Sequence, residues 1–302
     1  MTTIADNKTR FHTSAGVLQY LERYPELTTP GHFDVLRLME YGRLDVENHV
    51  YLDFTGGNLY AISQVRRHME FLNQRVLGNP HSVNPTSLAS TQFVENARKA
   101  VLDFFNARDY HCIFTANASA ALHIVGECYP FTNQSHLLLL SDNHNSVNGI
   151  REYCRRRGGN YSYCLVDHHN EMRINDEQLT ADLSSHPTAD AKLFAYPAQS
   201  NVTGVKHDLQ WINRAHAAGW DVLLDAAAFV PTDILDLSQV KPDFVSLSFY
   251  KIFGYPTGLG CLLVRKDSFT RLVKPAFAGG TISLVSVGAK GHFLMPGHER
   301  FE

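Results

Sequence analysis

Short runs of apolar residues alternate with helical patterns over most of the chain. From residue 111 onward each apolar run is about the length of one strand, and stretches with the spacing of amphipathic helices separate the runs. Strands joined by helical crossovers predict an α/β protein, with a mainly parallel seven-stranded sheet covered by helices. The expected strands are residues 111–115, 136–141, 161–166, 192–196, 221–225, 243–248 and 260–265, and the expected helices between them are 119–128, 146–157, 175–184 and 208–218.

The N-terminal part of the chain has a different pattern. Two amphipathic helical patterns, at 15–24 and 33–43, flank a Thr-Thr-Pro-Gly breaker at 28–31. We therefore expect an N-terminal helical arm at 1–50 and a large domain at 51–302.

The large domain is expected to begin with a short strand at Val50–Leu52. Helical patterns follow at about 60–76 and 87–106. Ser87 is the predicted N-cap of the second helix, because a serine hydroxyl can accept a hydrogen bond from a free amide of the first turn.

Composition narrows the class of protein. Hydrophobic residues make up 44% and charged residues 19% of the 302 residues, which is typical of a globular protein and excludes wholesale disorder. The 27 Lys and Arg residues nearly balance 30 Asp and Glu residues, and the longest basic run is Arg155–Arg157. We therefore expect no nucleic-acid partner.

The cysteines and the lengths of the apolar stretches bear on the cellular location of the protein. The five cysteines are an odd number without a CxxC pair, and the histidines lack partners at metal-ligand spacing. No 18-residue apolar stretch or signal-peptide core is present. The sequence therefore predicts no metal site, no membrane association and a cytoplasmic location.

Two side chains with chemical potential follow neighbouring strands. Asp225 ends one predicted strand and Lys251 follows the next, and ligands of open α/β sheets bind beyond the carboxyl ends of the strands. The apolar neighbours Phe249, Ile252 and Phe253 would partly remove the Lys251 amine from water, which favours Schiff-base chemistry. Taken alone, Lys251 is better explained as an ordinary surface lysine. The other motifs of the sequence therefore determine whether it is a Schiff-base lysine.

Several motifs around these two residues occur in the order known from one family. From Tyr51 onward the sequence resembles the pyridoxal-phosphate (PLP) enzymes of fold type I. Within them it resembles the class V aminotransferase and cysteine desulfurase superfamily, and especially the aminotransferase-like N-terminal part of molybdenum cofactor sulfurases. The motifs are FTANASAAL (114–122), DNHNSVNGIRE (142–152), SNVTGVKHDL (200–209), LLDAAAFVPTDILDLS (223–238) and SFYK (248–251).

The resemblance implies PLP as the cofactor and a role for each matching residue. A helix N-terminus suits the cofactor phosphate, an aromatic histidine suits the pyridine ring, and a carboxylate keeps the ring nitrogen protonated so that the ring can act as an electron sink. The implied catalytic residues are Lys251, which forms the internal aldimine, and His144, which stacks on the ring and is the candidate for proton transfer. The implied cofactor-binding residues are Ala118, Ser119, Ser248 and Tyr250 at the phosphate, Asn201 at the ring oxygen, and Asp225 at the ring nitrogen.

Two further strings match, and two positions depart from the pattern. LGNPHS (77–82) resembles the entrance loop, and in AGGTIS (278–283) the resemblance implies that Thr281 reaches the partner subunit's cofactor phosphate, hence a homodimer. Tyr250 stands where the desulfurases often carry histidine. Ala228 replaces a polar residue, which leaves Asn201 as the main partner of the ring oxygen.

The resemblance also implies a part that the chain lacks. Family members continue into a small C-terminal domain that carries a persulfide-forming cysteine and a substrate-binding arginine, so we expect this domain to be absent or incomplete here. Cys261 lies within a predicted strand, which favours a buried structural thiol. Three explanations stay open: a fragment, a second chain that supplies the domain, or PLP chemistry without a persulfide.

The functional hypothesis is a PLP-dependent enzyme that acts on an amino acid. The first expectation is C–S cleavage of L-cysteine, as in a cysteine desulfurase or molybdenum cofactor sulfurase. The alternatives are another class V reaction without a persulfide cysteine, namely that of an aminotransferase, a C–S lyase or a racemase, or a catalytically silent partner subunit.

Overall fold

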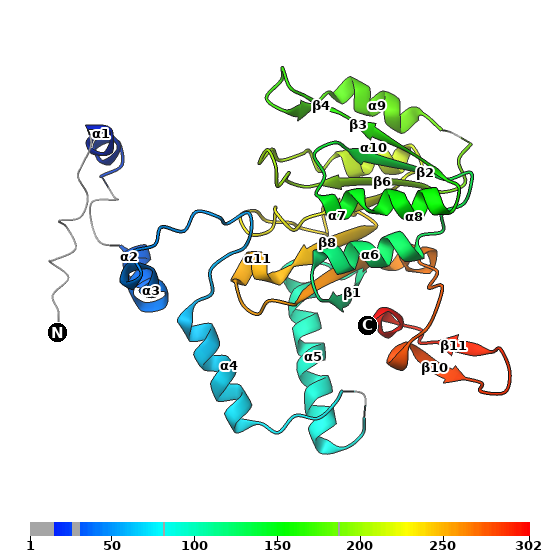
Figure 1. Ribbon diagram of the computed structural model, residues 1–302, viewed down its shortest axis with the longest axis horizontal. Coiled ribbons are helices and arrows are strands. Elements are labelled where there is room, and N and C mark those ends of the chain that lie inside the picture. Colours follow the sequence, from blue (N-terminus) through cyan, green and yellow to red (C-terminus); the bar gives the residue numbers. More distant parts are fainter. Residues whose placement is uncertain (1–14, 26–30, 81, 187) are drawn as a thin grey trace. The chain divides into compact units, whose positions relative to one another are not determined.

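The computed structural model describes residues 15–25, 31–80, 82–186 and 188–302 (Figure 1). These residues divide into two compact units. The first unit contains the described residues up to Leu52 together with Tyr60–His68, and the second contains Asp53–Leu59 and Met69–Glu302.

Parts of two predicted segments lie outside the described residues. The expected arm includes residues 1–14 and 26–30, and the expected entrance loop includes residue 81. The division into an arm and a large domain at residue 50 stays a prediction.

The first unit is helical, as its sequence pattern indicates. The carboxylate of Glu40 accepts a hydrogen bond from the amide of Ser63 at 2.8 Å, and the Arg43 guanidinium lies 4.3 Å from the centre of the Tyr60 ring. These polar and cation–π contacts connect its segments. Its helices are α1 (Ala15–Arg23), α2 (His32–Tyr41), α3 (Arg43–Val46) and the first part of α4 (Ile62–Gln74).

The second unit is built on a seven-stranded sheet with the strand order β1-β9-β8-β7-β6-β2-β3. Strands β3, β2, β6, β7 and β8 are mutually parallel, whereas β9 runs antiparallel to both β8 and β1. The predicted mainly parallel α/β sheet is confirmed. The strands are β1 (Tyr110–Thr115), β2 (His136–Leu140), β3 (Asn160–Cys164), β6 (Lys192–Pro197), β7 (Asp221–Asp225), β8 (Phe244–Ser248) and β9 (Gly260–Arg265).

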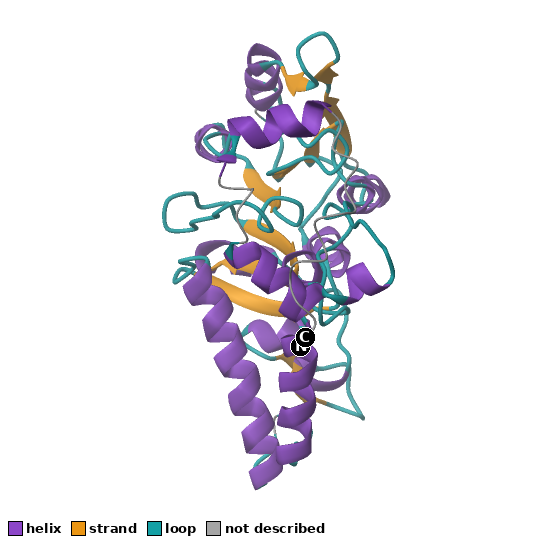
Figure 2. Ribbon diagram, turned by 90° about the vertical axis from the view of Figure 1, so that its left-hand side faces the viewer, coloured by secondary structure: helices purple, strands orange, loops and turns teal. Residues whose placement is uncertain are grey.

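Both faces of this sheet are buried, which explains the continuous apolar runs. In β2, Leu138 and Leu140 pack into the core on one face, while Leu137 and Leu139 pack into the core on the other. Residues of α9 and α10 cover the first face, and residues of α6, α7 and α8 cover the second. Figures 1 and 2 show helices on both sides of the strands.

Helix boundaries correct two details of the prediction. The N-cap of α5 is Asn84, whose side chain accepts a hydrogen bond from the Ser87 amide at 3.0 Å, so the prediction of Ser87 as the cap is wrong. The helix expected at 146–157 is divided at Gly149. The helices are α5 (Pro85–Phe104), α6 (Ala118–Cys128), α7 (Asn145–Asn148), α8 (Ile150–Arg156), α9 (Asp176–Ser184), α10 (Trp211–Ala217) and α11 (Phe249–Phe253).

The smaller elements were not predicted. The expected strand at Val50–Leu52 is wrong, because these residues pair with no strand in the described structure. The additional strands are β4 (Val166–Asp167), β5 (Arg173–Ile174), β10 (Ile282–Val285) and β11 (His292–Leu294), and the short 3-10 helices are η3 (Lys266–Arg271), η4 (Gly279–Thr281) and η5 (His298–Phe301).

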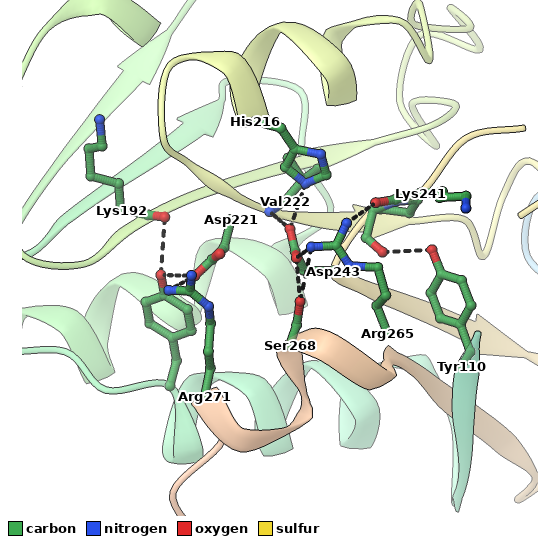
Figure 3. A network of polar contacts seen from close by, with 12 residues as sticks. Tyr110, Lys192, His216, Asp221, Val222, Lys241, Asp243, Arg265, Ser268 and Arg271 are labelled. Carbon is green, nitrogen blue, oxygen red and sulfur yellow. Dashed lines mark hydrogen bonds and ion pairs between the residues drawn. The ribbon is translucent and has the colours of Figure 1, made fainter.

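A buried polar cluster joins several elements at the amino-terminal edge of the parallel strands (Figure 3). Asp243, just before β8, is its centre, and Asp221 nearby forms an ion pair with Arg271 at 3.1 Å. Burial raises the pKa of Asp221. The Asp243 carboxylate accepts hydrogen bonds from His216 at 2.8 Å, the Val222 amide at 2.7 Å, Arg265 at 2.7 Å and Ser268 at 2.5 Å. These contacts fix the strands at the edge opposite to the predicted site.

The helices of the described structure lack the features of membrane spans. Across the described ranges, none of them combines the length and the apolar character that a bilayer span requires.

Candidate active site

The carboxyl ends of β1 and β8 meet the beginning of β9 at one point of the sheet. Thr115 at the end of β1 and Ser248 at the end of β8 both pair with Gly260, the first residue of β9. A Cβ atom on Gly260 would lie 2.4 Å from the Leu247 carbonyl oxygen and 2.8 Å from the Asn117 Cα atom. Only glycine therefore allows the turn after β1 to approach the end of β8 so closely.

This close approach places the N-terminus of α6 at the site. The Asn117 side chain caps the helix by accepting from the Ala120 amide at 2.9 Å, and Ser248 Oγ accepts from the Ala118 amide at 2.8 Å. The Ser119 amide has no acceptor within the described part of the chain. A free amide at a helix N-terminus, next to serine hydroxyls, favours an anion such as a phosphate.

Asp225 is the last residue of β7 and is 7% exposed. Its Oδ1 atom accepts hydrogen bonds from the Ala227 amide at 3.1 Å and from Ser246 Oγ at 3.0 Å. Within the described structure Oδ2 accepts none, so one oxygen of an oriented carboxylate is left for a ligand.

His144 is the N-cap of α7, in the turn that follows β2. Its Nδ1 atom accepts a hydrogen bond from the Ser146 amide at 3.1 Å, and Ser146 Oγ lies 2.6 Å from Ser119 Oγ. Because Nδ1 is an acceptor, the proton of the neutral ring is assigned to Nε2. The turn thus fixes both the orientation and the tautomer of the ring and joins it to the helix that carries Ser119.

Lys251 lies in α11, which starts immediately after β8. The Phe249 amide donates to the Leu259 carbonyl at 3.1 Å, so the chain returns past the helix and enters β9. Lys251 is half-buried, and no ion pair of its ammonium is found among the described residues. An amine without a carboxylate partner is free to face the cavity beside it.

These side chains line one cavity of about 110 Å³. Every residue predicted for the cofactor site lines it, which brings together segments from five separate parts of the chain. The lining residues are Asn117, Ala118, Ser119, Leu122, His144, Gln199, Asn201, Asp225, Ala227, Ala228, Ser248, Tyr250 and Lys251.

The structure adds residues that the motifs did not identify. Gln199 lines the cavity two positions before Asn201, and its buried Oε1 atom has no partner within the described ranges. Behind the cavity, His207 Nε2 lies 3.0 Å from Asp142 Oδ2, and this buried pair ties the loop of Asn201 to the turn of His144. The sequence offered one signal for these residues, namely that Asp142 and Gln199 follow the ends of β2 and β6.

Two other predicted residues lie elsewhere. Thr281 is buried in η4, where its hydroxyl accepts a hydrogen bond from the Ala278 amide at 3.1 Å, and it does not line the cavity. Its contact with a partner subunit stays a prediction. Cys261 is fully buried, and burial raises the pKa of its thiol, so the prediction of a structural cysteine is confirmed.

A larger hollow, of about 480 Å³, lies between α9 and α10. Its cations are already engaged: Lys192 donates to the Ala218 carbonyl at 2.5 Å, and Arg214 pairs with Asp176 at 2.6 Å. It contains none of the strand-end residues. The chemistry of the smaller cavity therefore marks it as the active-site candidate.

The sheet is mainly parallel and has helices on both faces, as in α/β enzymes. At its carboxyl edge lie a lysine, an oriented carboxylate and a helix N-terminus. The model of the family "Aminotransferase class-V" matches residues 50–302. The chain belongs to this family, which confirms the resemblance drawn from the motifs.

Similar proteins agree with this assignment. A molybdenum cofactor sulfurase of Solanum lycopersicum is 38% identical over 293 residues, covering 86% of this chain and 35% of that protein. The apo structure of a cysteine desulfurase from Thermococcus onnurineus NA1 matches with a TM-score of 0.77 and 25% identity, over 91% of this chain and 66% of that one. A C-DES mutant with glycine covalently linked to its PLP cofactor shares the fold, with a TM-score of 0.69 and 18% identity, over 91% and 69% of the two chains. The chain spans about a third of the length of the curated relative.

Proposed function

We propose that the cavity binds PLP and that the protein is a PLP-dependent enzyme. The observation that carries this proposal is that Lys251 and Asp225 line the same cavity, together with the free N-terminus of α6. The family and the PLP-containing fold neighbour support it.

The residues present fit the parts of the cofactor. The unpaired Ser119 amide and the hydroxyls of Ser119 and Ser248 would hold the phosphate, and the unpaired Oδ2 of Asp225 would hold the protonated ring nitrogen. Asn201 is the polar residue for the ring oxygen, beside the apolar Ala228. When bound, PLP supplies an electron sink that stabilises negative charge on the carbon next to the amino group.

The chain's own residues then have separate tasks. Lys251 would hold the cofactor through its Nζ atom, and the same amine is the group that would move a proton at the substrate carbon. His144 presents a ring whose Nε2 carries the proton, because Ser146 occupies Nδ1. Asp225 leaves its Oδ2 atom for the cofactor, because the Ala227 amide and Ser246 Oγ both donate to its Oδ1 atom.

We infer an amino-acid substrate, with C–S cleavage of L-cysteine as the reaction. L-cysteine and a thiol would give alanine and a persulfide: the Cβ–S bond breaks, the sulfur atom passes to the thiol, and a proton takes its place on Cβ. All five cysteines of this chain are buried and none lines the cavity. A thiol outside these 302 residues would therefore accept the sulfur.

We also propose a homodimer in the cytoplasm. Thr281 lies away from the cavity of its own chain, as a residue that serves a partner subunit would. The neighbouring hairpin of β10 and β11 exposes Leu284, Val287 and Phe293, an apolar surface that a second copy would cover.

The experiment combines spectroscopy with product analysis. Purified protein incubated with PLP is expected to gain a near-visible absorption band that borohydride removes, and Lys251→Ala is expected to lack it. With L-cysteine and an excess thiol reductant, equal amounts of alanine and sulfide support desulfuration. Pyruvate with ammonia would instead indicate a C–S lyase, and bound PLP without turnover of cysteine would indicate another class V substrate or a silent subunit. A protein that takes up no PLP would refute the proposal.

A further inference from the structure

Asn58 contacts the helix that carries Lys251, although the two segments are far apart in the sequence. Its Nδ2 atom donates a hydrogen bond to the Ile252 carbonyl at 2.8 Å, across 194 positions. Its backbone amide donates to the Tyr250 carbonyl at 3.2 Å. The two peptide carbonyls that flank Lys251 in the sequence are therefore both held by one residue.

Helix α11 needs such an external partner because it is very short. A helix leaves its last four carbonyls without intrahelical donors, and in the five-residue α11 the Gly254 amide supplies one bond, to Tyr250 at 2.8 Å. A helix of this length is unstable without tertiary contacts. Its orientation, and with it the direction of the Lys251 side chain, therefore depends on what holds its carbonyls.

The Asn58 side chain is itself held firmly. Its Oδ1 atom accepts a hydrogen bond from the Leu59 amide at 2.8 Å, so both ends of the carboxamide are used and the donor is directed at Ile252. The preceding Gly57 lies against the Tyr250 ring, where an added Cβ would be 3.3 Å from a ring carbon. The segment is thus packed against α11 beside the hydrogen bonds.

We propose that Asn58 is a positioning residue for Lys251: its carboxamide fixes the Ile252 carbonyl, and hence the rotation of α11 that directs the Lys251 amine into the cavity. This inference rests on the proposed function, because it assumes that Lys251 attaches PLP. Asn58 itself does not line the cavity, so its effect acts through the helix.

Two variants separate a hydrogen-bonding role from simple packing. Asn58→Asp keeps the shape and the Oδ1 acceptor but replaces the donor by an oxygen that faces the Ile252 carbonyl. Asn58→Ala removes the whole side chain. If the donor matters, Asn58→Asp is impaired at least as much as Asn58→Ala; if only packing matters, the isosteric Asn58→Asp resembles the wild type.

The readout is the covalent attachment of PLP, measured by absorbance titration and by the mass of the Lys251 peptide after borohydride reduction. Loss of one hydrogen bond predicts that Asn58→Ala attaches PLP about two- to ten-fold more weakly. Asn213→Ala is the matched control, because Asn213 is an exposed asparagine of α10 that donates to Gln210, the residue before this helix, and does not line the cavity. This control is expected to behave as the wild type.

The outcomes distinguish the two proposals. A wild-type protein that takes up no PLP refutes the proposed function. Wild-type attachment with unchanged attachment in Asn58→Asp refutes only the role of Asn58. If Asn58→Asp fails to fold, Asn58→Ala decides in the same way, since attachment equal to that of the Asn213→Ala control overturns the inference.

Discussion

Replacing Asp225 by asparagine separates the charge of this side chain from its structural contacts. The carboxylate uses Oδ1 for the Ala227 amide and for Ser246, at 3.1 and 3.0 Å. Asparagine can place its own oxygen at this position and keep both hydrogen bonds. Its NH2 group then replaces Oδ2, the atom proposed to hold the protonated ring nitrogen.

The expected magnitudes follow from these contacts. The fold keeps both hydrogen bonds and loses a buried charge, so we expect the free energy of unfolding without PLP to change by no more than about 1 kcal/mol. Binding of PLP loses one charge-assisted hydrogen bond, worth about 1.5–3 kcal/mol, which weakens the affinity about 10- to 150-fold. Turnover should fall further, because an unprotonated ring is a poorer electron sink.

The assay is a PLP titration followed by absorbance, with urea unfolding of the cofactor-free protein in parallel. Asp236→Asn is the control: Asp236 lies outside the cavity and accepts hydrogen bonds from Ser238. An Asp225→Asn variant with the PLP affinity and turnover of the wild type would refute the role assigned to the carboxylate. A loss of stability far above that of the control would show that Asp225 acts on the fold instead.

Two further predictions concern the framework of the site. Burial raises the pKa of Asp243, but hydrogen bonds from His216, Ser268 and the Val222 amide lower it by more, so the pKa in the folded protein lies below its ordinary value. The ionised carboxylate therefore stabilises the fold at pH values above the ordinary pKa near 3.9, and this contribution is lost as the pH falls through the pKa of the folded state. Asp243→Asn should therefore cost about 3–5 kcal/mol in urea unfolding at pH 7 and less below about pH 4, and a cost independent of pH would contradict this. Gly260→Ala forces a Cβ against backbone atoms at 2.4 and 2.8 Å, so we expect a loss of about 1–3 kcal/mol or more in thermal unfolding and weaker PLP binding. Unchanged stability and affinity would show that the close approach is dispensable.

The main strands could be predicted because the sheet is covered on both faces. Such strands are continuous apolar runs, and the buried pattern of β2 and β7 shows why their limits agree with the sequence to within about a residue. The site residues could be predicted because they follow these strands and match family motifs. Their roles as cofactor ligands stay predictions.

What the sequence could not indicate depends on contacts between distant segments. The bond from Asn58 to Ile252 spans 194 positions, and neither residue belongs to a periodic pattern. The choice of Asn84 over Ser87 as the cap is different, because it follows from a local signal: the fixed φ angle of Pro85 suits the first position of the helix. The strand expected at Val50–Leu52 fails because an apolar run forms a strand only where a neighbouring strand pairs with it.

The central claim is that the amine of Lys251 holds PLP covalently in this cavity. The most direct measurement is peptide mass spectrometry of the protein incubated with PLP and reduced with borohydride. The account predicts one modified peptide, containing Lys251, with the added mass of reduced PLP, and no such peptide in Lys251→Ala. Modification spread over exposed lysines, or unmodified Lys251 in a protein that retains PLP, would contradict it.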